Sequence, residues 1–262
     1  KVATGHTEAI VAGGVEMMSR VPMLSDAARV FSDPAYAVQH QMLLMGSGAD
    51  LIATRIGANR EDCDAVALLS QQRAALAQKE GRFQSIMPVK TPKGMISEDE
   101  CIRADMTAER LATLPAAFAE LGAAGADQVQ LQKFPELSAI EHVHTMGNSP
   151  AMCDAGALVL LGDEALGSSL GMAPKARLVC STTASGEPLE VVSGCVTATE
   201  ALLADPKLSA QYFDLFEFHE AFAATVVKTR QVLGIDDSRL NVNGGVIALG
   251  HPMGATGAIM TG

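Results

Sequence analysis

The sequence predicts an α/β protein, and two observations carry that prediction. Residues 157–163 ("ALVLLGD") and 176–182 ("ARLVCST") are apolar runs of strand length, and 212–218 ("YFDLFEF") is a third, less regular run. Apolar runs without polar alternation are typical of strands covered on both faces, as in a parallel or mixed sheet between helices. Helical patterns occupy 195–204 and 220–233. Strands that alternate with helices indicate α/β architecture.

The elements before these runs follow from local signals. Residues 8–16 ("EAIVAGGVE") predict a short buried strand that ends at the Gly13-Gly14 pair, where backbone freedom is needed. Residues 21–58 are rich in Met and Gly without a sustained period, so we expect irregular chain with short helices. The clearest helix is 60–80, because Asn59 can cap it and an acid follows at Asp62.

Weaker signals complete the chain. Residues 82–141 have a loop-like composition with several prolines, and short helices are plausible at 107–113 and 115–121. The 220–233 helix is closed by Gly234. Another helix is expected to start between 254 and 258.

Composition bounds the function. The 262 residues are 48% apolar and 19% charged, which is typical of a folded globular protein. A net charge of −11 argues against nonspecific binding to nucleic acid or anionic membrane, although a local basic pocket for a phosphorylated ligand stays open. No apolar run reaches the length of a transmembrane helix. The start lacks a signal-peptide pattern and an initiator Met, so we expect a partial sequence of a cytoplasmic protein.

Cysteines and histidines are the candidate metal ligands. Five widely spaced cysteines without a C-x-x-C pair are typical of reduced intracellular thiols, and zinc is not favoured. His142 and His144 would share one face of a strand, which allows a metal pair or two hydrogen-bonded histidines. The second alternative is favoured because no third ligand lies nearby.

The candidate chemistry lies in two segments. His219 and Glu220 stand where the 212–218 run meets the 220–233 helix, and ligands of open α/β sheets bind at such strand ends. His251 lies in the glycine-rich stretch "NVNGGVIALGHPMGATG" (241–257). That stretch allows a phosphate-binding loop, a structural glycine turn or a catalytic histidine loop, and it contains neither standard phosphate-loop motif.

Five segments in order resemble the thiolase family. The 241–257 stretch is similar to the family's histidine motif, and "HEAFA" (219–223) resembles its Asn-Glu-Ala-Phe segment with His in the Asn position. The other three resemble the stretch after the nucleophile helix, the loop-domain helix and the Gly-Asn-Ser segment: "IVAGGVEMMSRVP" (10–22), "REDCDAVALLSQQRAALAQKEGRF" (60–83) and "HTMGNSPAMCDAGALVLL" (144–161).

The resemblance implies a fold and a division of the chain. Thiolases have two similar α/β halves in layered αβαβα packing, and the first half is expected to be incomplete here. The implied parts are the end of the N-terminal half, a loop domain that binds coenzyme A, the last strands of the N-terminal half and the start of the C-terminal half: 1–20, 21–140, 141–170 and 171–262.

The resemblance also implies an acyltransferase reaction. Thiolases cleave 3-oxoacyl-CoA with coenzyme A through an acyl-cysteine intermediate, or run the reverse Claisen condensation. His251 would activate the nucleophilic thiol and face the oxyanion, which suits a side chain with an ordinary pKa near 6.5. His219 would replace the family's Asn, which positions a water or donates to the thioester oxyanion. A His there resembles a subset that includes the trifunctional fatty-acid-oxidation type.

Coenzyme A contacts carry over to five positions. Arg103 suits an adenosine or phosphate contact, although a solvated surface Arg is its plain alternative. Phe118 and Phe222 fit a cofactor wall, although on pattern alone such residues belong more often to the core. Met146 and Ala221 complete the set. Coenzyme A and acyl-CoA are implied as substrates, with no tightly bound cofactor and no metal.

Neither catalytic cysteine of the family matches any of the five cysteines, so the 262-residue chain alone is expected to be inactive. Two alternatives stay open. One is a non-catalytic or truncated thiolase-like subunit that binds acyl-CoA or a partner, and the other is a condensing enzyme that uses an acyl carrier protein. The latter needs a second His-Gly-Thr-Gly-like segment, which the sequence lacks. The resemblance further implies β-oxidation, a homodimer or homotetramer, and a fatty-acid-oxidation α subunit as candidate partner.

Overall fold

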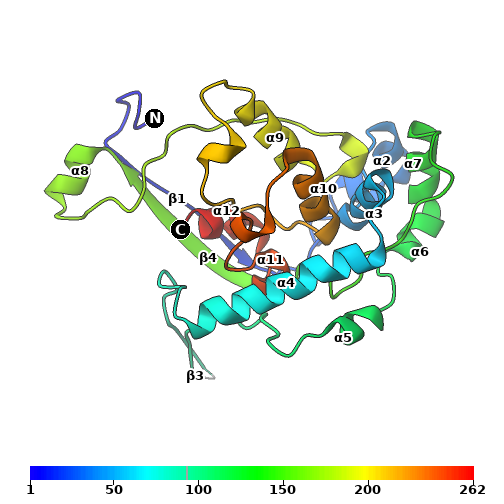
Figure 1. The fold of residues 1–262 in the computed structure, drawn as a ribbon, viewed down its shortest axis with the longest axis horizontal. Coiled ribbons are helices and arrows are strands. Elements are labelled where there is room, and N and C mark those ends of the chain that lie inside the picture. The colour runs from blue at the N-terminus through cyan, green and yellow to red at the C-terminus, as the bar shows by residue number, and fades with distance from the viewer. Residues whose placement is uncertain (93) are drawn as a thin grey trace. The chain divides into compact units, whose positions relative to one another are not determined.

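The computed structural model describes residues 1–92 and 94–262, drawn in Figure 1. Their chain contacts divide into two compact units. The first unit comprises Lys1–Pro22, Met152–Ser181 and Pro252–Gly262, and the second comprises Met23–Ala151 and Thr182–His251. Each unit therefore gathers segments that lie far apart in the sequence. Both candidate histidines belong to the second unit.

The first unit is built on two strands. β1 (Ala9–Met17) pairs antiparallel with β4 (Asp154–Gly162). η5 (Met253–Ala255) and α12 (Thr256–Thr261) pack on this pair. Gly14 of β1 lies directly against η5, because a Cβ added at Gly14 would sit 2.0 Å from the Gly254 carbonyl oxygen. The strands predicted at 8–16 and 157–163 and the helix start near 254–258 are therefore confirmed. The predicted strand end at Gly13-Gly14 is wrong, because β1 stays paired with β4 through both glycines as far as Met17.

The prediction of a parallel or mixed sheet with strands covered on both faces is wrong for the described residues. β1 and β4 run antiparallel, and side chains alternate between half-buried and exposed along β4. Val15 and Leu158 are 74% and 77% exposed. An apolar run predicts that a segment avoids water, but it does not specify strand direction or what covers each face.

Two further predictions of strands also fail. Residues 176–182 have neither helix nor strand structure, and Leu178 and Val179 are exposed. Within 212–218, only Phe216 makes a bridge, a parallel one to Leu240. A strand needs a hydrogen-bonding neighbour as well as an apolar sequence, and the described chain offers 176–182 none.

The second unit is mainly helical, and its longest helix is α4 (Arg60–Lys79). Asn59 accepts from the Asp62 backbone N–H while the Asp62 carboxylate accepts from the Asn59 backbone N–H, which completes a capping box. Gly81 follows with φ +68°. The helix predicted over 60–80 is thus confirmed together with its start signal.

A second long helix, α3 (Met45–Ile56), falls where the sequence predicted irregular chain with short helices. Its first turns hold glycine and serine, which favour helices poorly. Tertiary packing decides the outcome, because residues 46–53 are all buried. A Cβ at Gly46 would lie 2.3 Å from the Phe118 ring, and one at Gly48 would lie 2.5 Å from the Glu190 carbonyl oxygen.

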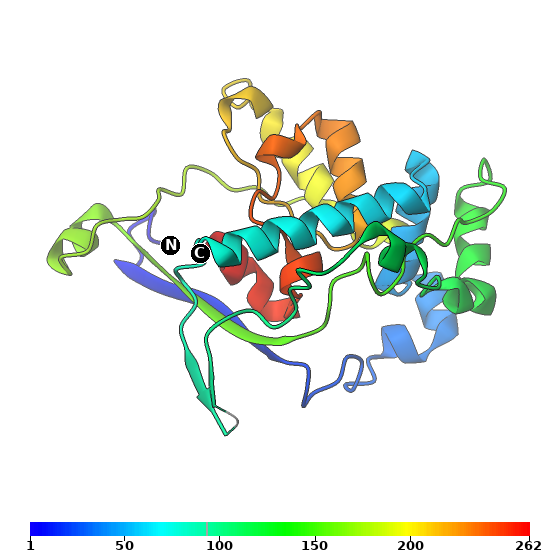
Figure 2. The same ribbon diagram turned by 60° about the horizontal axis from the view of Figure 1, so that its bottom comes forward.

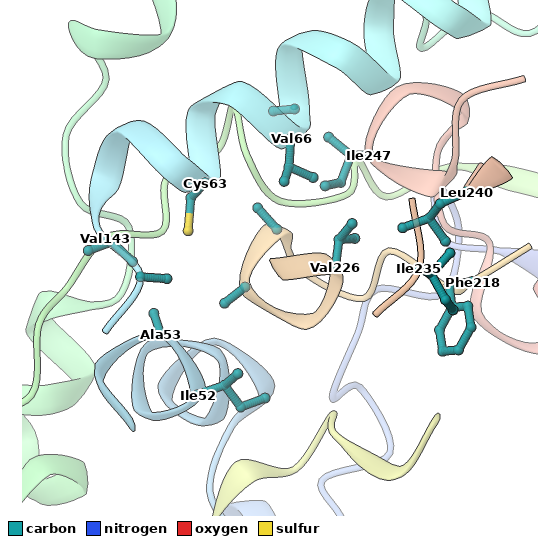
Figure 3. Packing of buried hydrophobic residues seen from close by; sticks show 14 of the residues in the cluster. Ile52, Ala53, Cys63, Val66, Val143, Phe218, Val226, Ile235, Leu240 and Ile247 are labelled. Carbon is teal, nitrogen blue, oxygen red and sulfur yellow. The ribbon is translucent and has the colours of Figure 1, made fainter. Parts of the chain in front are cut away.

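The core of the second unit forms around α10 (Ala223–Leu233). This helix packs on α3, α4 and α9 (Gly194–Leu203), and α11 (Val246–Leu249) packs on α4 (Figure 2). Figure 3 shows the side chains that meet there, with Val66 of α4 facing Val226 and Ile247. The helices predicted over 195–204 and 220–233 are confirmed, and Gly234 ends the latter in the left-handed conformation.

The remaining elements are short. They are α1 (Arg29–Ser32), α2 (Pro34–Gln39), β2 (Val89–Thr91), β3 (Gly94–Ile96), α5 (Ala108–Ala112), α6 (Ala119–Leu121), the π-helix η1 (Gly122–Ala126), α7 (Asp127–Lys133), α8 (Glu164–Ser169), and the 3-10 turns η2 (Pro188–Glu190), η3 (Ala210–Tyr212) and η4 (Asp237–Arg239). β2 pairs antiparallel with β3. None of the described helices combines the length and apolarity that crossing a membrane requires.

Candidate functional site

His219 follows a segment that is fastened to the chain leading into the glycine-rich loop. The Phe216 N–H donates to the Arg239 carbonyl at 2.7 Å, and the Asn241 N–H donates to the Phe216 carbonyl at 2.8 Å. The Asn241 side chain then bonds both backbone groups of Phe218, accepting from its N–H at 2.7 Å and donating to its carbonyl at 3.0 Å. The residue before His219 is therefore held at both of its hydrogen-bonding groups.

His251 follows α11 after a sharp change of direction. Gly244 and Gly250 adopt φ values of +79° and +92°, which glycine reaches without steric cost. The His251 N–H donates to the Ala151 carbonyl at 2.8 Å. The loop is thereby tied to the 144–161 segment, which also contains Met146, one of the predicted coenzyme A residues.

The two predicted catalytic histidines are neighbours. Their ring centroids lie 4.5 Å apart with an angle of 57° between the ring planes. The Nδ1 atom of His219 is buried and has no hydrogen-bond partner among the described residues. A buried nitrogen without a partner normally carries a cost, which a bound ligand or water would remove.

Both histidines are kept neutral at physiological pH. Burial, with a smaller contribution from His251, lowers the pKa of His219 to about 4. Burial also lowers the pKa of His251 below its usual value. A neutral imidazole can accept a proton at one nitrogen while it donates a hydrogen bond from the other. The pair can therefore supply a general base and a donor to a developing oxyanion.

Three of the five predicted coenzyme A residues lie together. Phe118 and Phe222 make an edge-to-face contact with ring centroids 5.7 Å apart. Ala221 and Phe222 are buried in one small cluster with Ala49, and Phe118 packs against it. The site role of these three residues stays a prediction, since their burial also suits a structural role.

The structure places Arg103 and Met146 outside that cluster. Both are exposed, Met146 to 74%. The backbone N–H of Arg103 donates to the Gln71 side chain at 2.7 Å, which fixes the backbone of Arg103 against α4. An exposed guanidinium on a fixed backbone can meet a phosphate, and it can equally remain a solvated surface group.

Glu220 is a functional candidate to which the sequence assigned no role. Its side chain is buried, yet the carboxylate accepts from the Ser70 hydroxyl, the Asn241 amide and the Ile247 N–H. Burial raises the pKa of Glu220, while these donors oppose that effect. The sequence offered one signal for this role, which is a charged residue between two apolar segments. Carboxylates are rarely buried unless they are paired, so a buried Glu220 needs specific partners.

The other histidine pair forms a hydrogen-bonded cluster. Residues 142–144 do not form a strand, and both histidine Nδ1 atoms bond to Asp50, at 2.8 Å for His142 and 2.7 Å for His144. His144 Nε2 also accepts from the Ala224 N–H. The favoured alternative of hydrogen-bonded histidines is confirmed. In residues 1–92 and 94–262, no three His, Cys, Asp or Glu side chains are arranged so that they could hold a metal ion.

The cysteines of the helical core are poor nucleophiles. Burial, followed by the charge of Asp64, raises the pKa of Cys63 to about 12. Burial also raises the pKa of Cys195. The thiolate is the reactive form of a cysteine, so neither side chain suits nucleophilic chemistry.

Comparisons with known proteins agree with the sequence resemblance. Residues 1–130 match the family model for the thiolase N-terminal domain, and residues 172–262 match the thiolase C-terminal domain. The chain is 35% identical to the 3-ketoacyl-CoA thiolase of Bacillus subtilis (strain 168), over 100% of this chain and 65% of that protein. It is 34% identical to an acetyl-CoA acetyltransferase of Allochromatium vinosum, over 98% of this chain and 65% of that protein.

The same family appears among solved structures. The crystal structure of human mitochondrial 3-ketoacyl-CoA thiolase matches with a TM-score of 0.80 and 30% identity, over 98% of this chain and 65% of that one. The predicted α/β fold of thiolase type is therefore confirmed. The chain spans 65% of the length of each of these three relatives, slightly less than two thirds.

Proposed function

Because this chain belongs to the thiolase family, we propose that the protein carrying it is an acyl-CoA acyltransferase that cleaves 3-oxoacyl-CoA with coenzyme A. The observation that supports this proposal is the pair of neutral histidines, His219 and His251, whose rings lie 4.5 Å apart. They come from the two segments that resemble the family's Asn-Glu-Ala-Phe and histidine motifs. Relatives named 3-ketoacyl-CoA thiolase and acetyl-CoA acetyltransferase add support.

In the proposed reaction, a cysteine thiolate attacks C3 of the substrate. The bond between C2 and C3 breaks, the electron pair stays on C2 of the leaving acetyl-CoA, and a proton is delivered to that carbon. Coenzyme A then donates its thiol proton to a base and attacks the acyl-cysteine, which releases the shortened acyl-CoA. His251 is proposed to take the thiol proton, since its lowered pKa keeps it neutral and ready to accept.

His219 is proposed to stabilise the thioester oxyanion. Its neutral ring can donate from one nitrogen at physiological pH, and preorganised donors of this kind contribute about 3–4 kcal/mol to transition-state binding. Because His219 stands where most of the family has Asn, we propose that the protein belongs to the fatty-acid-oxidation subgroup. Along with that subgroup we propose β-oxidation as its setting, a cytoplasmic location, a homodimer or homotetramer, and a fatty-acid-oxidation α subunit as partner.

Coenzyme A and acyl-CoA are the proposed substrates, without a tightly bound cofactor. Phe118, Ala221 and Phe222 are proposed to pack against the pantetheine chain, and Met146 to contact it from the surface. Arg103 is proposed to contact the adenosine or a phosphate of coenzyme A. We also retain the division into parts of the two α/β halves and a coenzyme A-binding loop domain at 21–140. The proximity of Phe118 to the HEAF segment supports a loop domain that closes over the histidines.

The test is acetyl-CoA release by the full-length protein from a 3-oxoacyl-CoA when coenzyme A is added, followed by chromatography. His251→Ala is expected to lower kcat/KM by at least about a hundredfold. The exposed His6→Ala serves as control and should behave like the wild type. An unchanged rate in His251→Ala contradicts the assigned role of His251. Binding of acyl-CoA without turnover in the wild type favours the non-catalytic subunit instead.

A further inference from the structure

The buried side chain of Glu220 is hydrogen-bonded to the segments that hold His219 and His251 in place. Glu220 is 2% exposed, and its two oxygens accept three hydrogen bonds. They come from the Ser70 hydroxyl at 2.7 Å, the Asn241 side-chain amide at 3.0 Å and the Ile247 backbone N–H at 3.1 Å. All three partners act as donors toward it, so every one of these hydrogen bonds uses an oxygen of Glu220 as the acceptor.

One side of this network leads to His219. The Asn241 amide that donates to Glu220 also donates to the Phe218 carbonyl, while its oxygen accepts from the Phe218 N–H. Phe218 directly precedes His219, and Glu220 directly follows it. The backbone on both sides of His219 is thus tied to the same carboxylate.

The other side leads to His251. Glu220 bonds to Ile247 in α11, the short helix that ends at Gly250 just before His251. The Ser70 hydroxyl donates to Glu220 and accepts from the Gly245 N–H at 3.0 Å. Ser70 of α4 therefore links the Glu220 carboxylate to Gly245, the residue directly before α11. This contact fixes the start of the helix that leads to His251.

The fit between Glu220 and the loop leaves no free space. A Cβ at Gly245 would lie 2.3 Å from Glu220 Cδ and 2.6 Å from its Oε2. A Cβ at the neighbouring Gly244 would lie 2.6 Å from the Ser70 carbonyl oxygen. Such close contact transmits a change at the carboxylate directly to the loop backbone.

From this network we propose that Glu220 is a positioning residue that sets the separation and orientation of His219 and His251, an inference that rests on the proposed function of the two histidines. Glu220 acts through Asn241 and Ile247 rather than on the substrate. The role requires two acceptor oxygens, because an amide in place of the carboxyl group would turn a donor toward Asn241, Ser70 or Ile247.

The first experiment compares two buried glutamates in the full-length protein. Glu220→Gln is expected to lower kcat by at least about tenfold while KM for coenzyme A stays within about threefold, since misplaced catalytic groups cost rate rather than binding. Glu190→Gln is the matched control: it is equally buried, but its partners are Arg55 and Lys228. An equal kcat loss in both variants overturns the proposal, because it indicates a general effect of replacing a buried carboxyl group.

A second variant keeps the test decisive if Glu220→Gln does not fold. Ser70→Ala removes the hydroxyl between Glu220 and Gly245 and leaves the carboxylate in place. It is expected to lower kcat by about threefold to tenfold, and the double variant should lose less than the product of the two single losses, because both act through one network. Full multiplicativity, or a wild-type kcat in Ser70→Ala, contradicts the proposed network.

A spectroscopic readout separates this inference from the proposed function. The titration of the two histidines is followed by NMR of their Cε1–H signals in wild type, Glu220→Gln and Ser70→Ala. The proposal expects a changed titration of His219 and His251 in both variants, whereas unchanged titration overturns it. If the wild type releases no acetyl-CoA, the proposed function fails, and the NMR titration alone still decides whether Glu220 or Ser70 positions the pair.

Discussion

His219 and His251 are held close together and uncharged, and the cost of charging His219 should appear as acid sensitivity. Its pKa of about 4 in the folded protein lies below the usual value near 6.5, so the unfolded chain binds the proton more readily. The stability that depends on neutral His219 is therefore complete above pH 6.5 and falls as the pH drops toward 4.

We expect His219→Asn to lose less stability than the wild type between pH 7.5 and pH 5.0. The difference between the two stability losses should be on the order of 1 kcal/mol, because His219 is half-buried and solvent screens part of its charge. Urea unfolding at both pH values measures it. The exposed His6→Asn is the comparison and should follow the wild type. Parallel loss in His219→Asn and wild type would show that His219 charges freely in the folded protein.

At the scale of elements, α4 matters because it carries Ser70 and supports α10 and α11. Its capping box satisfies backbone donors at its first turn. We expect Asn59→Ala to lower the free energy of unfolding by about 1 kcal/mol, measured by urea denaturation. Asn59→Asp keeps a capping oxygen and should cost much less. Equal losses in the two variants would mean that the cap is not the stabilising feature.

His142 joins α3 to α7 through Asp50 and Asp127. Burial lowers its pKa, but hydrogen bonds and charge from the two carboxylates outweigh that effect and raise the pKa above its usual value. The charged form is thus favoured by folding. Its stabilising contribution is complete below pH 6.5 and is lost as the pH rises through the raised pKa.

The loss of stability caused by His142→Asn should therefore be larger at pH 6.0 than at pH 8.5. Urea unfolding of both proteins at the two pH values measures the difference. In an Asp127→Asn background, which removes one of the two carboxylates, the pH dependence of the His142 effect should become weaker. An effect of the same size at both pH values would contradict a charged His142 in the folded protein.

At the scale of the whole chain, one ion cluster joins parts far apart in sequence. Glu190 pairs with Arg55 of α3 at 2.5 Å and with Lys228 of α10 at 2.6 Å. Burial raises the pKa of Glu190, but Lys228 and its other partners outweigh it and lower the pKa. The charged carboxylate therefore links three segments of the second unit.

Removing that carboxylate deprives Arg55 and Lys228 of the anion that they share. We expect Glu190→Ala to lower the free energy of unfolding by about 2–3 kcal/mol, less than for a fully buried pair because both cations are partly exposed. Thermal and urea unfolding measure the loss. The exposed Glu200→Ala, in α9 of the same unit, should cost less than about 0.5 kcal/mol. Similar losses in both variants would exclude a structural role for the ion cluster.

The sequence by itself determined the family, the α4 helix with its cap, and the strands at β1 and β4, and it singled out the two histidines of the candidate site. These rest on local signals, such as a capping box at Asn59 and motif wording around His251, which need no knowledge of the fold. Only the tertiary structure decided that α3 is one long buried helix, that 176–182 is not a strand, and that Glu220 reaches both histidine segments. These three features have one physical cause, which is that each depends on residues far away in the sequence. Such distant partners set the burial of a glycine-rich helix, the pairing of a strand and the contacts of a buried carboxylate.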